Sequence, residues 1–152
     1  MEERLRFKVW NKRLKKMYDV RSMSYYKNKI VRIEVCEKYK NGESDILIFD
    51  EYERMIDECV LLQCTGMKDD NNILIYEGDI VDKGTRCKWI ITWFKNRFII
   101  VPDFEYENRN KWANDRVCGF AYFENNHSYA DEDDEVIGNI YENADLLKEG
   151  KE

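Results

Sequence analysis

Short apolar segments, each ended by a polar turn, recur along nearly the whole chain of 152 residues. In residues 5–9 and 29–37 apolar side chains alternate with polar ones, the pattern of a strand that buries one face. No apolar repeat with a period of 3.6 residues is long enough for an extended helix, and the single proline leaves no proline-rich linker. The sequence therefore predicts a mainly β fold of short antiparallel strands with at most one or two short helices.

The expected strands share an apolar run that a turn-forming segment closes. They comprise residues 5–9, 17–20, 29–37, 45–49, 60–63, 73–76, 80–81, 87–94, 97–101, 117–123 and 136–141. The first two strands form an N-terminal hairpin. Residues 50–56 predict a short helix capped by Asp50, and residues 143–147 predict a short helical turn. The polar loops expected are residues 107–115 and 124–134.

Charge divides the chain more sharply than any other compositional property. Residues 1–40 carry 13 Lys and Arg against 5 Asp and Glu, whereas residues 41–152 carry 12 against 26. A basic arm of this kind either binds nucleic acid or lies against acidic surface of its own chain or of a second copy. The net charge of −6 works against phosphate attraction, so the second interpretation is favoured.

Composition indicates a folded chain outside membranes. Hydrophobic residues make up 43% and aromatic residues 14%, which excludes general disorder because such a chain can bury a core. No run approaches the ~20 apolar residues that a membrane helix requires, and the N-terminus lacks the apolar core of a secretory signal. We therefore expect one cooperative unit located in the cytoplasm.

Four cations gather at the expected tip of the N-terminal hairpin, with an aromatic residue beside them. Trp10 falls on the polar side of its strand, where the indole would pack at an edge and keep its N–H near water. Tyr18, Tyr25 and Tyr26 follow in the sequence and add stacking surfaces. The candidate partner-binding residues are Trp10, Lys12, Arg13, Lys15 and Lys16.

The cysteines indicate neither a disulfide framework nor a zinc site. They are odd in number and widely spaced: Cys36, Cys59, Cys64, Cys87 and Cys118. No two of them are separated by two residues, the spacing that is typical of a tetrahedral zinc site. We expect reduced, buried thiols that pack as small apolar side chains.

The sequence offers weak candidates for catalysis or metal binding. His127, the only histidine, lies in a polar loop, which favours a solvated side chain over a catalytic base. Gly66, Gly78 and Gly84 are isolated turn glycines rather than a phosphate-binding loop. Residues 131–135 are acidic but lack the glycine-bent spacing of a calcium loop. We expect no cofactor and no enzymatic activity, and a small hydrolase that uses His127 is the low-ranked alternative.

Three blocks of the sequence occur together, and in the same order, in one known family. They are Arg6-Phe7-Lys8-Val9-Trp10-Asn11, residues 63–81 with the run Tyr76-Glu77-Gly78-Asp79, and residues 136–147 with the run Gly138-Asn139-Ile140-Tyr141. In this combination the chain resembles the YopX-like proteins of phages and prophages. The resemblance implies an SH3-like barrel over residues 59–148, with an N-terminal hairpin region over residues 1–58 packed on it, and a bacterial host cell. It carries no activity, cofactor or catalytic residue with it.

We expect the function of a non-enzymatic accessory protein of a phage or prophage, which binds a host or phage protein. The basic hairpin and the aromatic strand at residues 89–94 are the surfaces that indicate this role. The hairpin is also expected to mediate self-association. The alternative is a nucleic-acid-binding protein that uses residues 12–16 and the adjacent aromatic side chains. Membrane association is not expected.

Overall fold

The computed structural model describes residues 6–38, 44–50, 58–95, 97–111 and 135–147. The strands within these ranges are β1 (Phe7–Asn11), β2 (Lys16–Tyr26), β3 (Lys29–Lys38), β4 (Ser44–Asp50), β5 (Cys59–Lys68), β6 (Leu74–Tyr76), β7 (Asp79–Asp82), β8 (Trp89–Phe94), β9 (Arg97–Pro102) and β10 (Glu135–Asn139). Two short 3-10 helices follow β9 and β10, namely η2 (Asp103–Asn108) and η4 (Ala144–Leu147).

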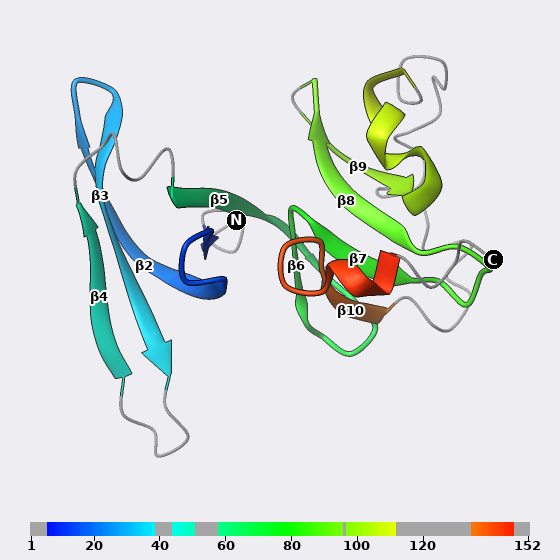
Figure 1. Cartoon of the computed structure of the whole chain (residues 1–152), viewed down its shortest axis with the longest axis horizontal. Helices are drawn as coiled ribbons and strands as arrows, with labels where there is room; N and C mark the ends of the chain where they lie inside the picture. The colour runs from blue at the N-terminus through cyan, green and yellow to red at the C-terminus, as the bar shows by residue number, and fades with distance from the viewer. Residues whose placement is uncertain (1–5, 39–43, 51–57, 96, 112–134, 148–152) are drawn as a thin grey trace.

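The strands pair antiparallel and form two sheets. The larger one, here called the N-terminal sheet, has the order β4-β3-β2-β1-β5-β6, and the C-terminal sheet has the order β10-β7-β8-β9. In Figure 1 the arm made by β2, β3 and β4 lies on one side of β5, and the C-terminal sheet lies on the other. The expected mainly β, antiparallel fold is confirmed.

The barrel expected for residues 59–148 is not closed. Within the described part of the chain, pairing ends at β4 and β6 in one sheet and at β10 and β9 in the other. The N-terminal sheet also runs through the boundary expected near residue 58, because β5 pairs with β1 over the full length of β1. The two regions therefore share a continuous sheet, and their unfolding as one unit stays a prediction.

The second strand is much longer than residues 17–20. It continues to Tyr26 and changes partner along its length, pairing with β1 at its start and with β3 beyond Asp19. The register shifts between Val20 and Ser22, so Arg21 is an extra residue that bends the strand. This bend lets β3 turn back over the inner face of β1.

The first apolar core lies inside this bend. Its buried centre consists of Val9, Tyr18, Ile33 and Val35, with Val20, Met23, Ile30, Cys59 and Leu61 packed around it. Side chains alternate between the faces of a strand, so Lys8 and Trp10 point away from this core. Both faces of β1 are therefore covered, one by β3 and the other by the C-terminal part of the protein.

The second core joins the end of the N-terminal sheet to the C-terminal sheet. It is built from Ile75, Val81, Ile91 and Ile100, with Met67, Trp89, Phe98 and Val136 packed against it. A smaller cluster of Phe94, Ile99 and Val101 occupies the other face of the β8–β9 ribbon. The aromatic strand predicted at residues 87–94 thus belongs to the interior of the C-terminal sheet, with Trp93 exposed at its end.

Other sequence-based expectations have mixed outcomes. The helical turn expected at residues 143–147 is confirmed as η4. Residues 107–111, expected in a loop, instead complete η2 and continue as a helical turn. Asp50 is the last residue of β4, and the rest of the helix expected there lies outside the described residues. The same holds for the strand expected at residues 117–123.

Candidate functional site

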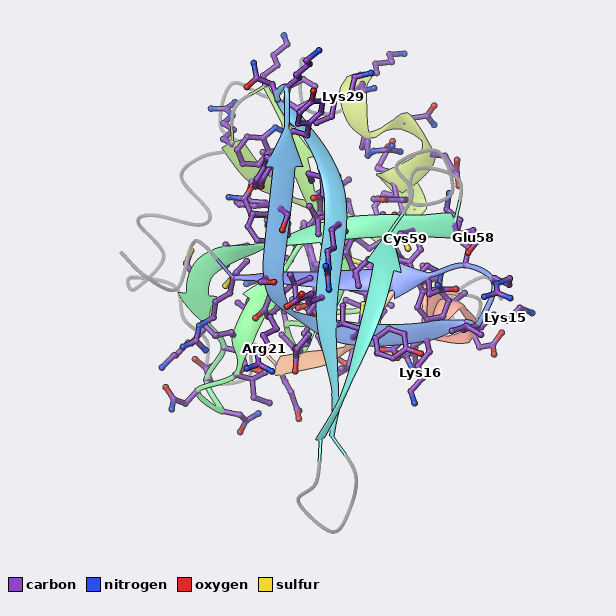
Figure 2. The ribbon with its side chains drawn as sticks, turned by 90° about the vertical axis from the view of Figure 1, so that its left-hand side faces the viewer. Lys15, Lys16, Arg21, Lys29, Glu58 and Cys59 are labelled. Atoms are coloured by element: carbon purple, nitrogen blue, oxygen red, sulfur yellow. The ribbon has the colours of Figure 1, made fainter. Side chains whose placement is uncertain are left out.

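The cations predicted at the hairpin tip do gather on one turn, residues 12–16, which we call the basic turn. Lys12, Arg13, Lys15 and Lys16 are all exposed. Figure 2 shows Lys15 and Lys16 at the end of the β1–β2 hairpin, on the same side of the molecule as Glu58. Residues 6–38 hold 11 Lys and Arg but only 3 of the chain's 31 Asp and Glu, so this segment, which forms β1, β2 and β3, carries a strongly positive local charge.

The backbone of the basic turn is held by contacts at its base. Asn11 is fully buried, and its Oδ1 accepts the Leu14 N–H at 2.8 Å. The Lys12 N–H donates to the Glu58 carbonyl oxygen at 2.7 Å, just before β5 begins. Lys15 adopts a φ of 50°, which lets the chain turn back into β2. The turn is therefore preformed, and Leu14 is presented on it with 48% of its surface exposed.

Side-chain contacts around the turn are weaker. Arg13 Nε lies 3.6 Å from Glu58 Oε2, and their side chains are 64% and 29% exposed, so this ion pair contributes little to stability. The Lys16 ammonium lies 5.5 Å from the centre of the Tyr18 ring. Beside Glu58, burial raises the pKa of the Cys59 thiol, and the Glu58 charge raises it further against the opposing effect of Lys12. The thiol is therefore poorly suited to act as a nucleophile at neutral pH.

Trp10 does not belong to this surface, which corrects the prediction from the sequence. It is only 8% exposed and stacks on Tyr141 with ring centres 6.2 Å apart. Its neighbour on the same face, Lys8, places its ammonium 4.4 Å from the centre of the Tyr76 ring. The face of β1 that was expected near water is instead covered by the C-terminal part of the protein, where Tyr141 packs on Trp10 and Tyr76 lies under Lys8.

Of the other aromatic residues expected beside the basic turn, Tyr18 lies next to it but is buried, and Tyr25 and Tyr26 are separated from it. Tyr18 is buried in the first core, where burial raises its pKa. Tyr25 and Tyr26 lie at the far end of β2, where Lys27 and Asn28 turn the chain into β3. This second turn was not predicted, although residues 25–29, Tyr-Tyr-Lys-Asn-Lys, combine a turn-forming asparagine with flanking cations and aromatic rings.

Three polar residues of the C-terminal part stabilise its backbone. Asp79 is 3% exposed; its Oδ2 accepts the Tyr76 N–H at 2.7 Å, and its Oδ1 accepts Asn139 Nδ2 at 2.9 Å. Burial raises the pKa of Asp79, and these two hydrogen bonds oppose the shift. Asp69 accepts the Ile73 N–H at 2.7 Å across its turn and the Val136 N–H at 3.0 Å from β10. These groups fix the connections between strands.

Glycine is required where the C-terminal turn meets Asn139. Gly78 has a φ of +81°, and a Cβ placed there would lie 3.2 Å from Asn139 Nδ2. Its N–H donates to the Ile91 carbonyl oxygen at 2.8 Å, and its own carbonyl oxygen accepts the Ile140 N–H at 2.9 Å. The run Glu77-Gly78-Asp79 therefore connects β6, β8 and the segment after β10.

Ionisable side chains also meet beside Trp10. Arg109 lies over the Tyr106 ring, 4.7 Å from its centre, and donates to the Tyr106 carbonyl oxygen at 3.1 Å. Burial raises the pKa of Glu77, which the Trp93 N–H and the Arg109 charge partly offset. Burial also raises the pKa of Tyr141. These side chains hold η2 against β8 and against the segment after β10.

Metal and cysteine chemistry can be judged only for part of the chain. Among the residues that the structure describes, no group of three His, Cys, Asp or Glu side chains is placed to hold a metal ion. Cys64 is buried, and Cys59 and Cys87 are half-buried, all as free thiols. His127, residues 131–134 and the side chains of Cys36 and Cys118 lie outside the described part. No helix in the described ranges is long and apolar enough to cross a membrane.

Tyr76 makes the stability of the protein sensitive to alkaline pH. Burial, the largest cause, raises its pKa from 10.0 to about 12. The folded state thus keeps the phenol proton that the unfolded chain loses, so this contribution is complete below pH 10 and is lost as pH rises toward 12. We expect the free energy of unfolding in urea to fall by about 1 kcal/mol more between pH 9 and pH 11 in the wild type than in Tyr76→Phe. Equal losses in both proteins would contradict the assignment.

The fold and its surface define a class: an antiparallel β protein of two sheets that displays a preformed basic turn. Sequence comparison then places it. The family model described as YopX protein matches residues 6–148, nearly the whole chain, so the chain belongs to the YopX family. The family resemblance seen in the sequence is thereby confirmed.

A solved structure and a search of curated proteins complete the comparison. The crystal structure of protein EF1440 from Enterococcus faecalis is similar to this chain with a TM-score of 0.55 and 24% sequence identity. The match covers 93% of this chain and 96% of that one, and it shows a shared fold. No curated protein matches the chain.

Proposed function

We propose that the protein is a non-enzymatic binding protein whose basic turn docks an acidic surface of a partner protein. The observation that carries this proposal is Leu14, an exposed apolar side chain with cations on both sides of it. An apolar centre within a polar rim is the usual anatomy of a protein interface. A phosphate backbone would use the cations but would gain nothing from the leucine, so the turn fits a protein partner better than nucleic acid.

The rigidity of the turn supports the same role. Two backbone amides, those of Lys12 and Leu14, are already hydrogen-bonded at its base. Binding would therefore cost little conformational entropy, which favours affinity. Arg13 forms an exposed ion pair with Glu58, which can be exchanged for another partner at low cost.

The polar residues of the C-terminal part support a non-enzymatic role. Asp69, Asp79 and Asn139 direct their side chains to backbone amides or to each other and act as structural supports. Membership of the YopX family supports the further proposal that the protein is an accessory protein of a phage or prophage. Its partner would then be a host or phage protein in the bacterial cytoplasm.

Photo-crosslinking from the basic turn tests the proposal. A benzophenone amino acid is placed at position 14 in one variant and at position 70, an exposed turn elsewhere, in a control. We expect a protein adduct from position 14 alone, which survives nuclease treatment and is lost in Lys15→Glu/Lys16→Glu. An adduct of twice the chain's own mass would identify a second copy as the partner.

The same experiment can reject the proposal. Equal adducts from positions 14 and 70 would mean that contact at the turn is random. An adduct that nuclease removes, or one that survives reversal of both lysine charges, would contradict a basic turn that docks an acidic protein. Thermal unfolding of each variant controls for loss of the fold.

A further inference from the structure

We propose that the tip of the β2–β3 hairpin, residues 25–29, binds single-stranded nucleic acid by stacking bases on Tyr25 and Tyr26. This tip, here called the aromatic tip, is distinct from the basic turn. Figure 2 shows Lys29 at one end of the upright β2–β3 hairpin, whereas Lys15 and Lys16 lie where β1 turns into β2, away from that end. The inference does not depend on the proposed docking of a protein.

The aromatic tip has a defined backbone. β2 ends at Tyr26 and β3 begins at Lys29, with Tyr26 and Lys29 paired across the hairpin. The two residues between them, Lys27 and Asn28, have φ values of 47° and 64°. Positive φ at both central residues is the signature of a two-residue hairpin turn whose twist matches its strands. The register shifts between Ser24 and Tyr25, which leaves one extra residue on β3, so the two tyrosines are carried on a tight hairpin turn with an irregularity next to it.

Both tyrosine rings are exposed on this support. Among the described residues, Tyr25 and Tyr26 are the two tyrosines with large exposed surfaces, 61% and 64%. Consecutive residues of a strand face opposite ways, so the two rings lie on opposite faces of the hairpin. The Tyr25 hydroxyl touches Met23 Sδ at 4.0 Å, which leaves its ring face available. Two separated aromatic platforms result.

The part of the β2–β3 hairpin that carries the rings is positively charged. Residues 20–33 contain Arg21, Lys27, Lys29 and Arg32 but no acidic residue. Lys27 places its ammonium 5.3 Å from the centre of the Tyr26 ring. The nearest acidic residue on β3, Glu34, already accepts the Ser22 hydroxyl at 2.9 Å and pairs with Arg32 at 3.1 Å. The tip therefore combines stacking surfaces with cations that can contact phosphates.

This combination fits a single strand better than a duplex or a protein. Aromatic platforms beside cations bind single strands with little sequence preference, because every base offers a flat face. Bases in a duplex are already stacked on one another and are not free to meet Tyr25 or Tyr26. The two rings lie on opposite faces of the hairpin, so they do not form the single apolar centre that is typical of a protein interface. The tip has no group committed to a 2′-hydroxyl, so DNA and RNA should bind alike.

Fluorescence anisotropy with labelled oligothymidylate and oligouridylate of about 15 nucleotides tests the inference. The full-length wild type should bind both probes at about 20 mM salt and release them at about 200 mM. Tyr25→Ala/Tyr26→Ala should weaken binding roughly tenfold or more, since stacking on each ring is lost. Tyr25→Phe/Tyr26→Phe should bind like the wild type because the ring remains. Phe104→Ala, which removes an aromatic ring exposed on η2, is the matched control and should also bind normally.

Four results would overturn the inference: no binding of either probe at low salt, equal binding by the wild type and the double alanine variant, loss of binding in the double phenylalanine variant, or tighter binding to a duplex. Circular dichroism and thermal unfolding establish that each variant is folded. If oligonucleotide binding fails while the position-14 adduct persists, the aromatic tip is excluded and the proposed protein docking stands. If the adduct fails while both probes bind, the reverse holds.

Discussion

Replacing Trp10 with alanine is expected to lower the free energy of unfolding by about 3–5 kcal/mol. The indole is 8% exposed and packs on Tyr141, so its removal leaves a large gap between β1 and the segment after β10. Urea unfolding followed by circular dichroism measures the loss directly. The result separates a structural tryptophan from the partner-binding tryptophan that the sequence alone indicates.

Trp93→Ala provides the matched control for Trp10. Trp93 is 45% exposed and contacts Phe98 edge to face, with ring centres 4.7 Å apart. Its removal should cost about 1–2 kcal/mol, because much of the ring is already in water and the remaining gap opens to solvent. If Trp10→Ala kept wild-type stability but lost the position-14 adduct, Trp10 would be a binding residue after all.

Asp79→Ala is expected to lower the free energy of unfolding by about 3 kcal/mol. The carboxylate serves both the Tyr76 N–H and Asn139 Nδ2. Alanine would leave the Tyr76 N–H without this acceptor and Asn139 Nδ2 with its longer hydrogen bond to the Glu77 carbonyl oxygen, at 3.3 Å. Removing a buried charge returns part of this cost, since burial already disfavours the ionised form. Chemical denaturation at neutral pH gives the difference from the wild type.

Two companion variants distinguish this role from a general effect of charge. Asp82→Ala breaks a pair with Lys88 whose N–O distance is 2.9 Å, but both side chains are about a third exposed. It should cost less than about 1 kcal/mol. Asp79→Asn retains one acceptor for the Tyr76 N–H and should fall between the wild type and Asp79→Ala. Equal losses for the two alanine variants would contradict a special structural role for Asp79.

Much of the strand pattern follows from the alternation of side chains, and its failures have physical causes. Residues 29–37 were predictable because Ile33 and Val35 bury one face of β3. The end of β2 was not, because its inward residues are Tyr18, Val20 and Met23, and the extra Arg21 interrupts the spacing of two. A bulge therefore breaks the alternation of side chains by which a strand is recognised in a sequence.

The basic turn was predictable from the sequence only in part. The cluster of cations at residues 12–16 is visible in the sequence, and the structure gathers it on one turn. The support from Glu58 is not visible, because it depends on β5 pairing with β1 across more than forty intervening residues. The prediction that Trp10 lies near water was wrong, because the sequence does not show whether one face of a strand is covered or both.

The contact between Trp10 and Tyr141 bears on how the chain folds as it is synthesised. β1 is translated well before Tyr141, the residue that stacks on Trp10 at its outer face. Throughout that interval a tryptophan-bearing strand lacks this cover, the kind of surface that promotes aggregation of nascent chains. The solubility of the nascent β1 strand therefore depends on synthesis of the segment after β10.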